Sequence, residues 1–251
     1  MKIAIVGSGN VATILGRLIV KSNHTVSQII SRNILHAKEL AEELNASYND
    51  FSIPVMDDAD LVILAISDYG IENLFSSIIK NDKLIVHTAG AIPMEALQKY
   101  SKNYGVLYPL QTLRKEVDIL PEIPFLIDGS SAEVLNIIEA FAKSISNDVQ
   151  RSSNEDRIKL HAAAVIVSNF TNYLYSIAED FCKKENVDFN LLKPLIKETA
   201  IRVQKHSPKD VQTGPAIRKD INTMDKHLRL LSQHPKLRTT YLRLTDSIMN
   251  P

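Results

Sequence analysis

The sequence of 251 residues contains one cysteine, Cys182, and no long hydrophobic run. A single cysteine cannot form an intramolecular disulfide, and it leaves no cysteine-based metal site. The longest apolar stretches, such as residues 61–66, are far shorter than the roughly 20 residues that a membrane helix needs. Gly7, Ser8 and Asn10 interrupt the apolar N-terminus too early for a signal peptide. We therefore expect a soluble cytoplasmic protein.

Several motifs of catalytic and binding proteins are also missing. No His, Asp or Glu spacing suggests a metal site, and no Walker loop or serine-centred elbow occurs. The net charge is zero, yet residues 1–150 carry 12 basic and 18 acidic residues, whereas residues 151–251 carry 17 and 11. The basic charges of the second half are scattered without a binding motif, so we expect no nucleic-acid partner. The asymmetry indicates two differently built halves.

The first half alternates short apolar runs with amphipathic stretches, which indicates βαβ units and a parallel sheet. Pro93 suits the first turn of a further helix. We expect strands at residues 2–6, 25–31, 61–66, 84–87, 105–107, 125–127 and near 149. We expect helices at residues 11–20, 34–44, 94–100 and 132–144.

The second half has a helical pattern. Ser152 followed by Glu155 matches a capping box, and thirty or so residues after it form one predicted helix. Its centre, residues 162–167, is apolar on every side, which predicts burial. About a hundred residues enclose only a small core, so we expect two copies to pack together as a homodimer. Shorter helices are predicted at residues 191–205, 223–231 and 236–249.

A glycine-rich turn joins the first predicted strand to the first helix. The segment Gly7-Ser8-Gly9-Asn10-Val11-Ala12 matches the Gly-x-Gly-x-x-Gly/Ala pattern of dinucleotide binding. In that pattern the first glycine permits the turn and the second admits a pyrophosphate, while free N–H groups at the helix start hold the phosphates. The alternative is a turn that happens to contain two glycines. The pattern predicts a fold in two parts, a Rossmann-like domain at residues 1–150 and an all-helical domain at 151–251.

The end of the second predicted strand indicates which dinucleotide is bound. Ser31 and Arg32 stand where an NAD site has an acidic residue for the ribose 2′-hydroxyl. A guanidinium can instead bind a 2′-phosphate through paired hydrogen bonds. The alternative is a solvated surface arginine. We therefore predict NADP(H) as the cofactor.

Two further loops follow predicted strands at the edge where open α/β sheets bind ligands. Their small residues would let a dinucleotide lie across that edge, although ordinary turns have the same composition. The predicted contributors are Ala65, Ile66 and Ser67 in one loop and Thr88, Ala89 and Gly90 in the other.

Together these segments resemble the 6-phosphogluconate dehydrogenase-like NADP-dependent oxidoreductases with a helical C-terminal domain, which include pyrroline-5-carboxylate reductase. The sequence is most similar to the branch that joins a Rossmann-like domain to a DUF2520 domain. The segments that carry the resemblance are 7–12, 87–91, 108–112, 161–164 with Ser168 and Asn169, and 213–215 with Arg218 and Asp220. The resemblance implies an N-terminal NADP domain and a C-terminal helical domain that forms a dimer.

The sequence departs from this superfamily at two positions. Its hydroxyacid dehydrogenases place a catalytic lysine four residues before an asparagine, whereas here Lys159 is followed at that spacing by Ala163. Tyr108 stands where many members of the branch have histidine. Lys159 stays a candidate catalytic residue, but a lysine-based hydroxyacid mechanism is not indicated.

Hydride transfer needs a proton donor and groups that orient the substrate. His161, Ser168 and Asn169 share one face of the long predicted helix, so His161 is the candidate acid and Asn169 the candidate orienting group. The alternative is a buried histidine whose ring nitrogens find hydrogen-bond partners within the core. Gln111 is a candidate for a substrate carbonyl, and Arg218 for a substrate carboxylate.

These features predict an NADPH-dependent oxidoreductase that reduces a small carbonyl or imine compound bearing a carboxylate. Two alternatives remain open at this point. The first is a non-catalytic NADP-binding sensor or scaffold, and the second is a dimerising structural protein with an empty nucleotide fold.

Overall fold

The computed structural model describes residues 1–74, 79, 83–117 and 119–251. Packing divides the chain into two units, Met1–Ser168 and Asn169–Pro251. The first unit contains the sheet and the start of the long helix, and we call it the sheet unit. The second consists of helices and their connections, and we call it the helical unit. The domain boundary expected near residue 150 stays a prediction.

Among the described residues, eight strands form one sheet in the order β3-β2-β1-β4-β5-β6-β7-β8. The six strands from β3 to β6 run parallel, β7 is antiparallel to β6, and β8 is parallel to β7. The order of those six is that of dinucleotide-binding sheets. The strands are β1 (Lys2–Val6), β2 (Thr25–Ile30), β3 (Ser47–Asn49), β4 (Leu61–Leu64), β5 (Leu84–His87), β6 (Tyr104–Pro109), β7 (Phe125–Gly129) and β8 (Val149–Arg151).

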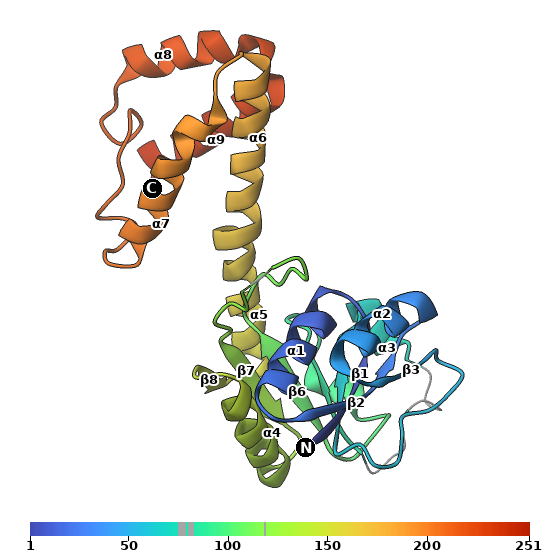
Figure 1. Ribbon diagram of the computed structural model, residues 1–251. Helices are drawn as coiled ribbons and strands as arrows, with labels where there is room; N and C mark the ends of the chain where they lie inside the picture. The colour runs from blue at the N-terminus through green and yellow to red at the C-terminus, as the bar shows by residue number, and fades with distance from the viewer. Residues whose placement is uncertain (75–78, 80–82, 118) are drawn as a thin grey trace. The chain divides into compact units, whose positions relative to one another are not determined.

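Helices cover both faces of this sheet (Figure 1). Side chains alternate along each strand, so Ile3 and Ile5 of β1 pack on one face and Ala4 and Val6 on the other. The first face is covered by α1 (Asn10–Lys21), α2 (Ile34–Leu44) and α4 (Ala132–Ile145). The second is covered by α3 (Asp68–Glu72) and the 3-10 helix η2 (Met94–Leu97). The apolar runs of the sequence therefore correspond to strands buried on both sides.

Most predicted elements of the first unit are confirmed, and two are wrong in detail. The helix predicted at 94–100 is one 3-10 turn, because its amides bond three residues back, as from Ala96 to Pro93. The capping box is displaced by one residue. Ser153, and not Ser152, caps α5 (Asn154–Ala164) by accepting from the Asp156 N–H, since the Ser152 N–H donates to Ile127 of β7.

The predicted long helix is continuous from Asn154 to Lys184, with a wider π-helical turn, Val165–Phe170, between α5 and α6 (Thr171–Lys184). The predicted burial of its apolar centre is wrong for a single chain. None of residues 162–167 is buried, and Val167 is 73% exposed. Apolar composition indicates that a surface needs cover, not which chain provides it.

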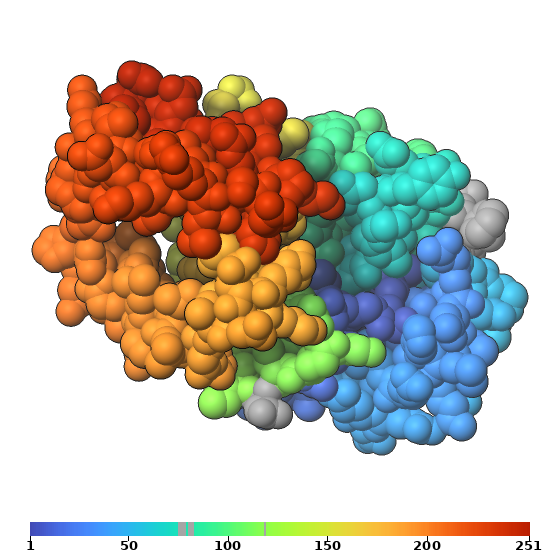
Figure 2. Space-filling model, turned by 90° about the horizontal axis from the view of Figure 1, so that it is seen from above, coloured from blue at the N-terminus to red at the C-terminus, as the bar shows by residue number. Residues whose placement is uncertain are grey.

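The second unit continues from α6 with η4 (Phe189–Leu192), α7 (Lys193–Val203), α8 (Ile221–Leu230), η5 (Leu231–Gln233) and α9 (Pro235–Met249). Few of its apolar side chains are buried: Cys182, Ala216, Met224 and Leu231. Others are largely exposed, including Leu191 at 77% and Leu195 at 61%. Figure 2 shows an opening within this unit between its orange and red segments. Its helices therefore do not close around a core of their own.

No helix within the described part of the chain has the length and apolar character required to cross a membrane.

Candidate functional site

A cleft of about 530 Å³ lies along the carboxyl ends of the parallel strands in the first unit. This is the edge at which open α/β sheets bind ligands. The described residues that line it include all of the predicted cofactor-binding residues. They are Gly7, Ser8, Gly9, Asn10, Val11, Ser31, Arg32, Phe51, Ala65, Ile66, Ser67, Asp68, Thr88, Ala89, Gly90, Tyr108 and His161.

The two glycines of the turn after β1 are required for different reasons. Gly7 has a φ of +126°, and a Cβ there would lie 2.1 Å from the Ala65 carbonyl oxygen. Only glycine fits this contact between the β1 and β4 loops. A Cβ on Gly9 would meet nothing within 4 Å, so the chain itself does not require glycine there. This open space beside the backbone suits the close approach of a pyrophosphate.

The N-terminus of α1 is arranged for an anion. Gly9 is the capping residue and offers no side chain to the free N–H groups of the first turn, which also lacks acidic residues. These N–H groups and the helix dipole favour bound phosphate. Together with the space at Gly9, they fit the pyrophosphate of a dinucleotide.

The end of the cleft at β2 carries the groups expected to select NADP. The Ser8 hydroxyl donates to the Ser31 hydroxyl at 2.8 Å, which joins the glycine turn to the end of β2. Arg32 follows and is exposed, so its guanidinium is accessible to a phosphate. Phe51 lines the same cleft.

At the other end of the cleft, Tyr108 and His161 are hydrogen bonded, with 2.9 Å between Tyr108 Oη and His161 Nδ1. Tyr108 is the penultimate residue of β6, and His161 lies on α5. The imidazole packs directly over Gly90, where a Cβ would lie 2.6 Å from Nδ1. The loop after β5 therefore requires glycine at this position to admit the ring.

His161 belongs to a polar stripe on α5 that faces the sheet unit. Asn154 Oδ1 accepts from the Met94 N–H, and the Arg157 Nη2 group donates to the Ile92 carbonyl. Further along, His161 bonds to Tyr108, and the Ser168 and Thr112 hydroxyls are 2.6 Å apart. The spacing of three, four and seven residues keeps these groups on one helix face. This stripe explains why the first unit extends to Ser168.

Burial perturbs three ionisable groups near this end of the cleft. His87 is fully buried, and desolvation followed by the nearby charge of Arg157 lowers its pKa to about 3. Burial raises the pKa of Tyr108, and the charge of Arg157 opposes that rise. Burial also lowers the pKa of Arg157, against the opposing charges of Asp128 and Glu95. His87 is therefore neutral at physiological pH.

Four predicted site residues do not line the cleft. The Lys159 ammonium is exposed and pairs with Glu155 at 2.6 Å. Gln111 turns its amide to its own loop, donating to the Glu122 carbonyl and accepting from the Thr112 N–H. Asn169 and Arg218 belong to the second unit, and their contribution to a substrate site stays a prediction.

The structure also reveals groups that the sequence did not indicate. Phe51 and Asp68 line the cleft, and Tyr108 and Arg157 lie against His161 and Ile92. Arg157 stands four residues before His161, a spacing that places both on one helix face. That spacing was the available signal for Arg157. The sequence marked Tyr108 only as a departure from the family, and its contact with His161 was not indicated because the two residues are 53 positions apart.

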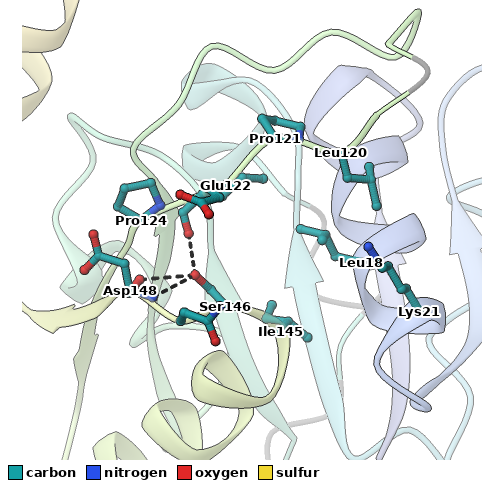
Figure 3. Close-up of a pocket in the computed structure, with 11 residues that line it drawn as sticks. Leu18, Lys21, Leu120, Pro121, Glu122, Pro124, Ile145, Ser146 and Asp148 are labelled. Atoms are coloured by element: carbon teal, nitrogen blue, oxygen red, sulfur yellow. Dashed lines mark hydrogen bonds between the residues drawn. The ribbon is translucent and has the colours of Figure 1, made fainter. Parts of the chain in front are cut away.

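A second hollow of about 320 Å³ lies between the C-terminal ends of α1 and α4 (Figure 3). Its polar groups bond to one another: the Ser146 hydroxyl donates to the Ile123 carbonyl and accepts from the Asp148 N–H. The positive end of α1 is at Asn10, whereas this hollow meets the other end, at Leu18 and Lys21. It therefore lacks the phosphate-binding geometry of the first cleft.

The fold and the cleft define a class of protein, a Rossmann-like dinucleotide-binding chain with a helical extension. Family models agree. Residues 2–90 match a family described as NADP oxidoreductase, coenzyme F420-dependent, and residues 123–248 match the domain of unknown function DUF2520. No curated protein matches the chain.

Solved structures give the same assignment. The Bacteroides fragilis protein BF3122, described as a "putative NADP oxidoreductase", is 38% identical, with 100% of this chain and 98% of that chain covered and a TM-score of 0.93. The chain therefore belongs to the family of NADP oxidoreductases that carry a DUF2520 domain, and its cofactor is NADP(H).

More distant structures share the fold alone. Pyrroline-5-carboxylate reductase of Streptococcus pyogenes is 17% identical, with 100% of this chain and 99% of that chain covered and a TM-score of 0.67. A reductive aminase of Aspergillus terreus, solved with NADPH and ethyl-5-oxohexanoate, is 15% identical, with 100% and 90% covered and a TM-score of 0.61.

Proposed function

We propose that the protein is an enzyme that reduces a small carbonyl or imine compound with NADPH, and that His161 donates the proton. The observation that carries the proposal is the position of His161. It lies at one end of a cleft whose other loops suit a dinucleotide. NADPH supplies a hydride when bound, and reduction of a C=O or C=N bond also consumes one proton.

The order of the strands supports this placement. The cleft is lined by loops that follow β2, β1, β4 and β5 and by Tyr108 of β6, and this is also the order of these strands across the sheet. Arg32 would hold the 2′-phosphate and Gly9 would admit the pyrophosphate, so the residues left for the nicotinamide end would be Gly90 and His161. Histidine is the side chain best suited to proton transfer near neutral pH.

Substitution of His161 tests the proposal. In His161→Asn, we expect turnover to fall about a hundredfold or more, the usual contribution of a positioned acid or base. NADPH affinity should change little, because the phosphate-binding loops are untouched. His36→Asn, which alters an exposed histidine on α2 outside the cleft, is the matched control.

The substrate is found by measuring NADPH oxidation against a panel of aldehydes, ketones and imines, each as a free acid and as its amide. Turnover of the acids but not the amides would support a carboxylate-bearing substrate, and the Arg218→Ala variant then tests the predicted contact. Tight NADPH binding without turnover of any member would favour a sensor or scaffold. Unchanged turnover per folded molecule in His161→Asn would make His161 a structural residue.

We also propose that the protein is a homodimer formed through its helical unit. Large apolar side chains of this unit are exposed in a single chain, among them Phe170, Tyr173, Leu191 and Leu195. Their burial against a second copy would contribute about 25 cal/mol per Å² of apolar surface. Sedimentation at micromolar concentration should give twice the chain mass of 28.1 kDa. A single-chain mass across a wide concentration range would contradict the proposal.

A further inference from the structure

Behind His161 lies a buried hydroxyl. Tyr108 is only 8% exposed, and its Oη is 2.9 Å from His161 Nδ1. The ring of His161 lies edge-on to that of Tyr108, at an interplanar angle of 76°. No described residue bonds to the other ring nitrogen, Nε2. Because the tyrosine occupies Nδ1, Nε2 is the nitrogen available to a substrate.

A buried cation lies one helical turn before His161 on α5. Arg157 is 1% exposed, and its Nη2 group donates to the Ile92 carbonyl and to Asn154 Oδ1. Its Nε and Nη1 groups find no partner among the described residues. A buried guanidinium with unpaired donors is costly, and such a group calls for an explanation. Burial raises the pKa of Tyr108, and the positive charge of Arg157 opposes that rise by favouring the phenolate.

We propose that Arg157, Tyr108 and His161 form a proton relay that ends in the cofactor cleft. Tyr108 donates its hydrogen bond to Nδ1, which fixes the ring as the tautomer with its proton on Nε2. This inference rests on the proposed function of His161 as the acid. Tyr108 is a positioning residue in this proposal, since it acts through its hydrogen bond to His161.

The relay balances in protons and electrons. When the substrate carbon accepts a hydride, the Nε2–H bond would break and an O–H or N–H bond would form on the substrate. The Tyr108 O–H bond breaks at the same time and an Nδ1–H bond forms, so the imidazole stays neutral. The negative charge is left on Tyr108 beside Arg157, and a proton from water returns through His161 after product release.

The tautomer of His161 tests the proposal on the free protein. Nitrogen-15 NMR of the neutral ring should show the proton on Nε2 in the wild type and a mixture of tautomers in Tyr108→Phe. A wild-type ring protonated on Nδ1, or a Tyr108→Phe ring identical to the wild type, would overturn it. Tyr104→Phe, on the same strand and without a hydroxyl contact to His161, is the matched control.

Turnover and the ionisation of Tyr108 give two further readouts. Loss of one hydrogen bond to the acid should lower kcat about tenfold or more in Tyr108→Phe, with KM little changed. In Arg157→Met, carbon-13 NMR of labelled tyrosine should show a higher pKa for Tyr108, and Arg157→Lys should restore most of the difference. If neither substitution changes the pKa of Tyr108, Arg157 takes no part in the relay.

The two proposals fail in different ways. If His161→Asn keeps its turnover, the proposed function fails whatever the tautomer. If His161→Asn loses turnover while Tyr108→Phe keeps both its turnover and the wild-type tautomer, His161 remains the acid and the relay alone is wrong.

Discussion

The two units of this chain bury their apolar residues to very different extents. In the sheet unit, strand residues such as Ile5 and Ile63 are fully buried, since helices of the same chain cover both faces. In the helical unit, buried apolar residues are few and Leu191 and Leu195 lie open. The sheet unit supplies its own cover, whereas the helical unit has apolar surface that a second copy would cover. Whether apolar residues are covered within one chain therefore differs from one unit to the other.

The largest effect should come from a charge on the exposed apolar face of α7. If the helical unit dimerises, Leu195→Asp buries an unpaired carboxylate, which costs about 3–5 kcal/mol. The dimer dissociation constant should then rise roughly a hundredfold or more, as measured by sedimentation. Ile137→Asp, an equally simple change at an exposed residue of α4 in the sheet unit, is the control and should leave the mass unchanged. If both variants sediment as dimers, α7 is not part of the interface.

The two glycines of the turn after β1 should separate folding from cofactor binding within the sheet unit. Gly7→Ala forces a Cβ onto the Ala65 carbonyl at positive φ, so the free energy of unfolding should fall by about 1–3 kcal/mol or more. Gly9→Ala has room for its methyl group and should change stability by less than about 0.5 kcal/mol.

Both glycine variants should bind NADPH more weakly. For Gly9→Ala the loss should be about tenfold or more, because the added methyl group would occupy the space that the pyrophosphate needs beside the backbone. Urea unfolding of the free protein and NADPH titration measure the two effects. Normal NADPH affinity in Gly9→Ala would show that the pyrophosphate lies elsewhere.

Arg32 should set the preference between the two dinucleotides. A charge-assisted hydrogen bond contributes about 1.5–3 kcal/mol, so Arg32→Ala should weaken NADPH roughly ten- to a hundredfold and barely change NADH. Arg151→Ala, on β8 and paired with Glu139, is the control for a general loss of positive charge. Equal losses for both cofactors would contradict the assignment of Arg32 to the 2′-phosphate.

The last effect concerns pH and the buried core of the sheet unit. His87 has a folded-state pKa of about 3, below the ordinary value of 6.5. Between these values the unfolded chain binds the extra proton, so stability is complete above about pH 6.5 and falls as the pH falls. From pH 7 to pH 5 the loss from this group is about 2 kcal/mol.

Replacement of His87 isolates that contribution. His87→Asn keeps an acceptor for the Ala89 N–H but cannot titrate, so its urea midpoint should decline less between pH 7 and pH 5. A decline equal to that of the wild type would assign the acid sensitivity to other groups.

Much of the sheet unit followed from local sequence patterns. The bounds of β1, α2 and β5 agree with the predicted ones, because continuous apolar runs and amphipathic periodicity report short-range geometry. The antiparallel β7 and the brief 3-10 turn at Met94–Leu97 were not indicated, since neither strand direction nor helix type changes that periodicity. The burial predicted for the apolar centre of the long helix was wrong for a single chain, because apolar composition does not say which chain covers a surface.

The sequence by itself determined the nucleotide half of the cleft, because one glycine turn places a strand end, free N–H groups and a helix start within a few residues. Only the tertiary structure decided what His161, the acid proposed from the sequence, contacts at the other half of the cleft. Tyr108 and His161 are 53 residues apart and meet through the docking of α5 on the sheet unit. Arg157 lies one helical turn before His161, and its burial was not indicated by the sequence. Local geometry is determined by residues that are neighbours in the sequence, whereas a contact between distant elements depends on how the whole unit packs.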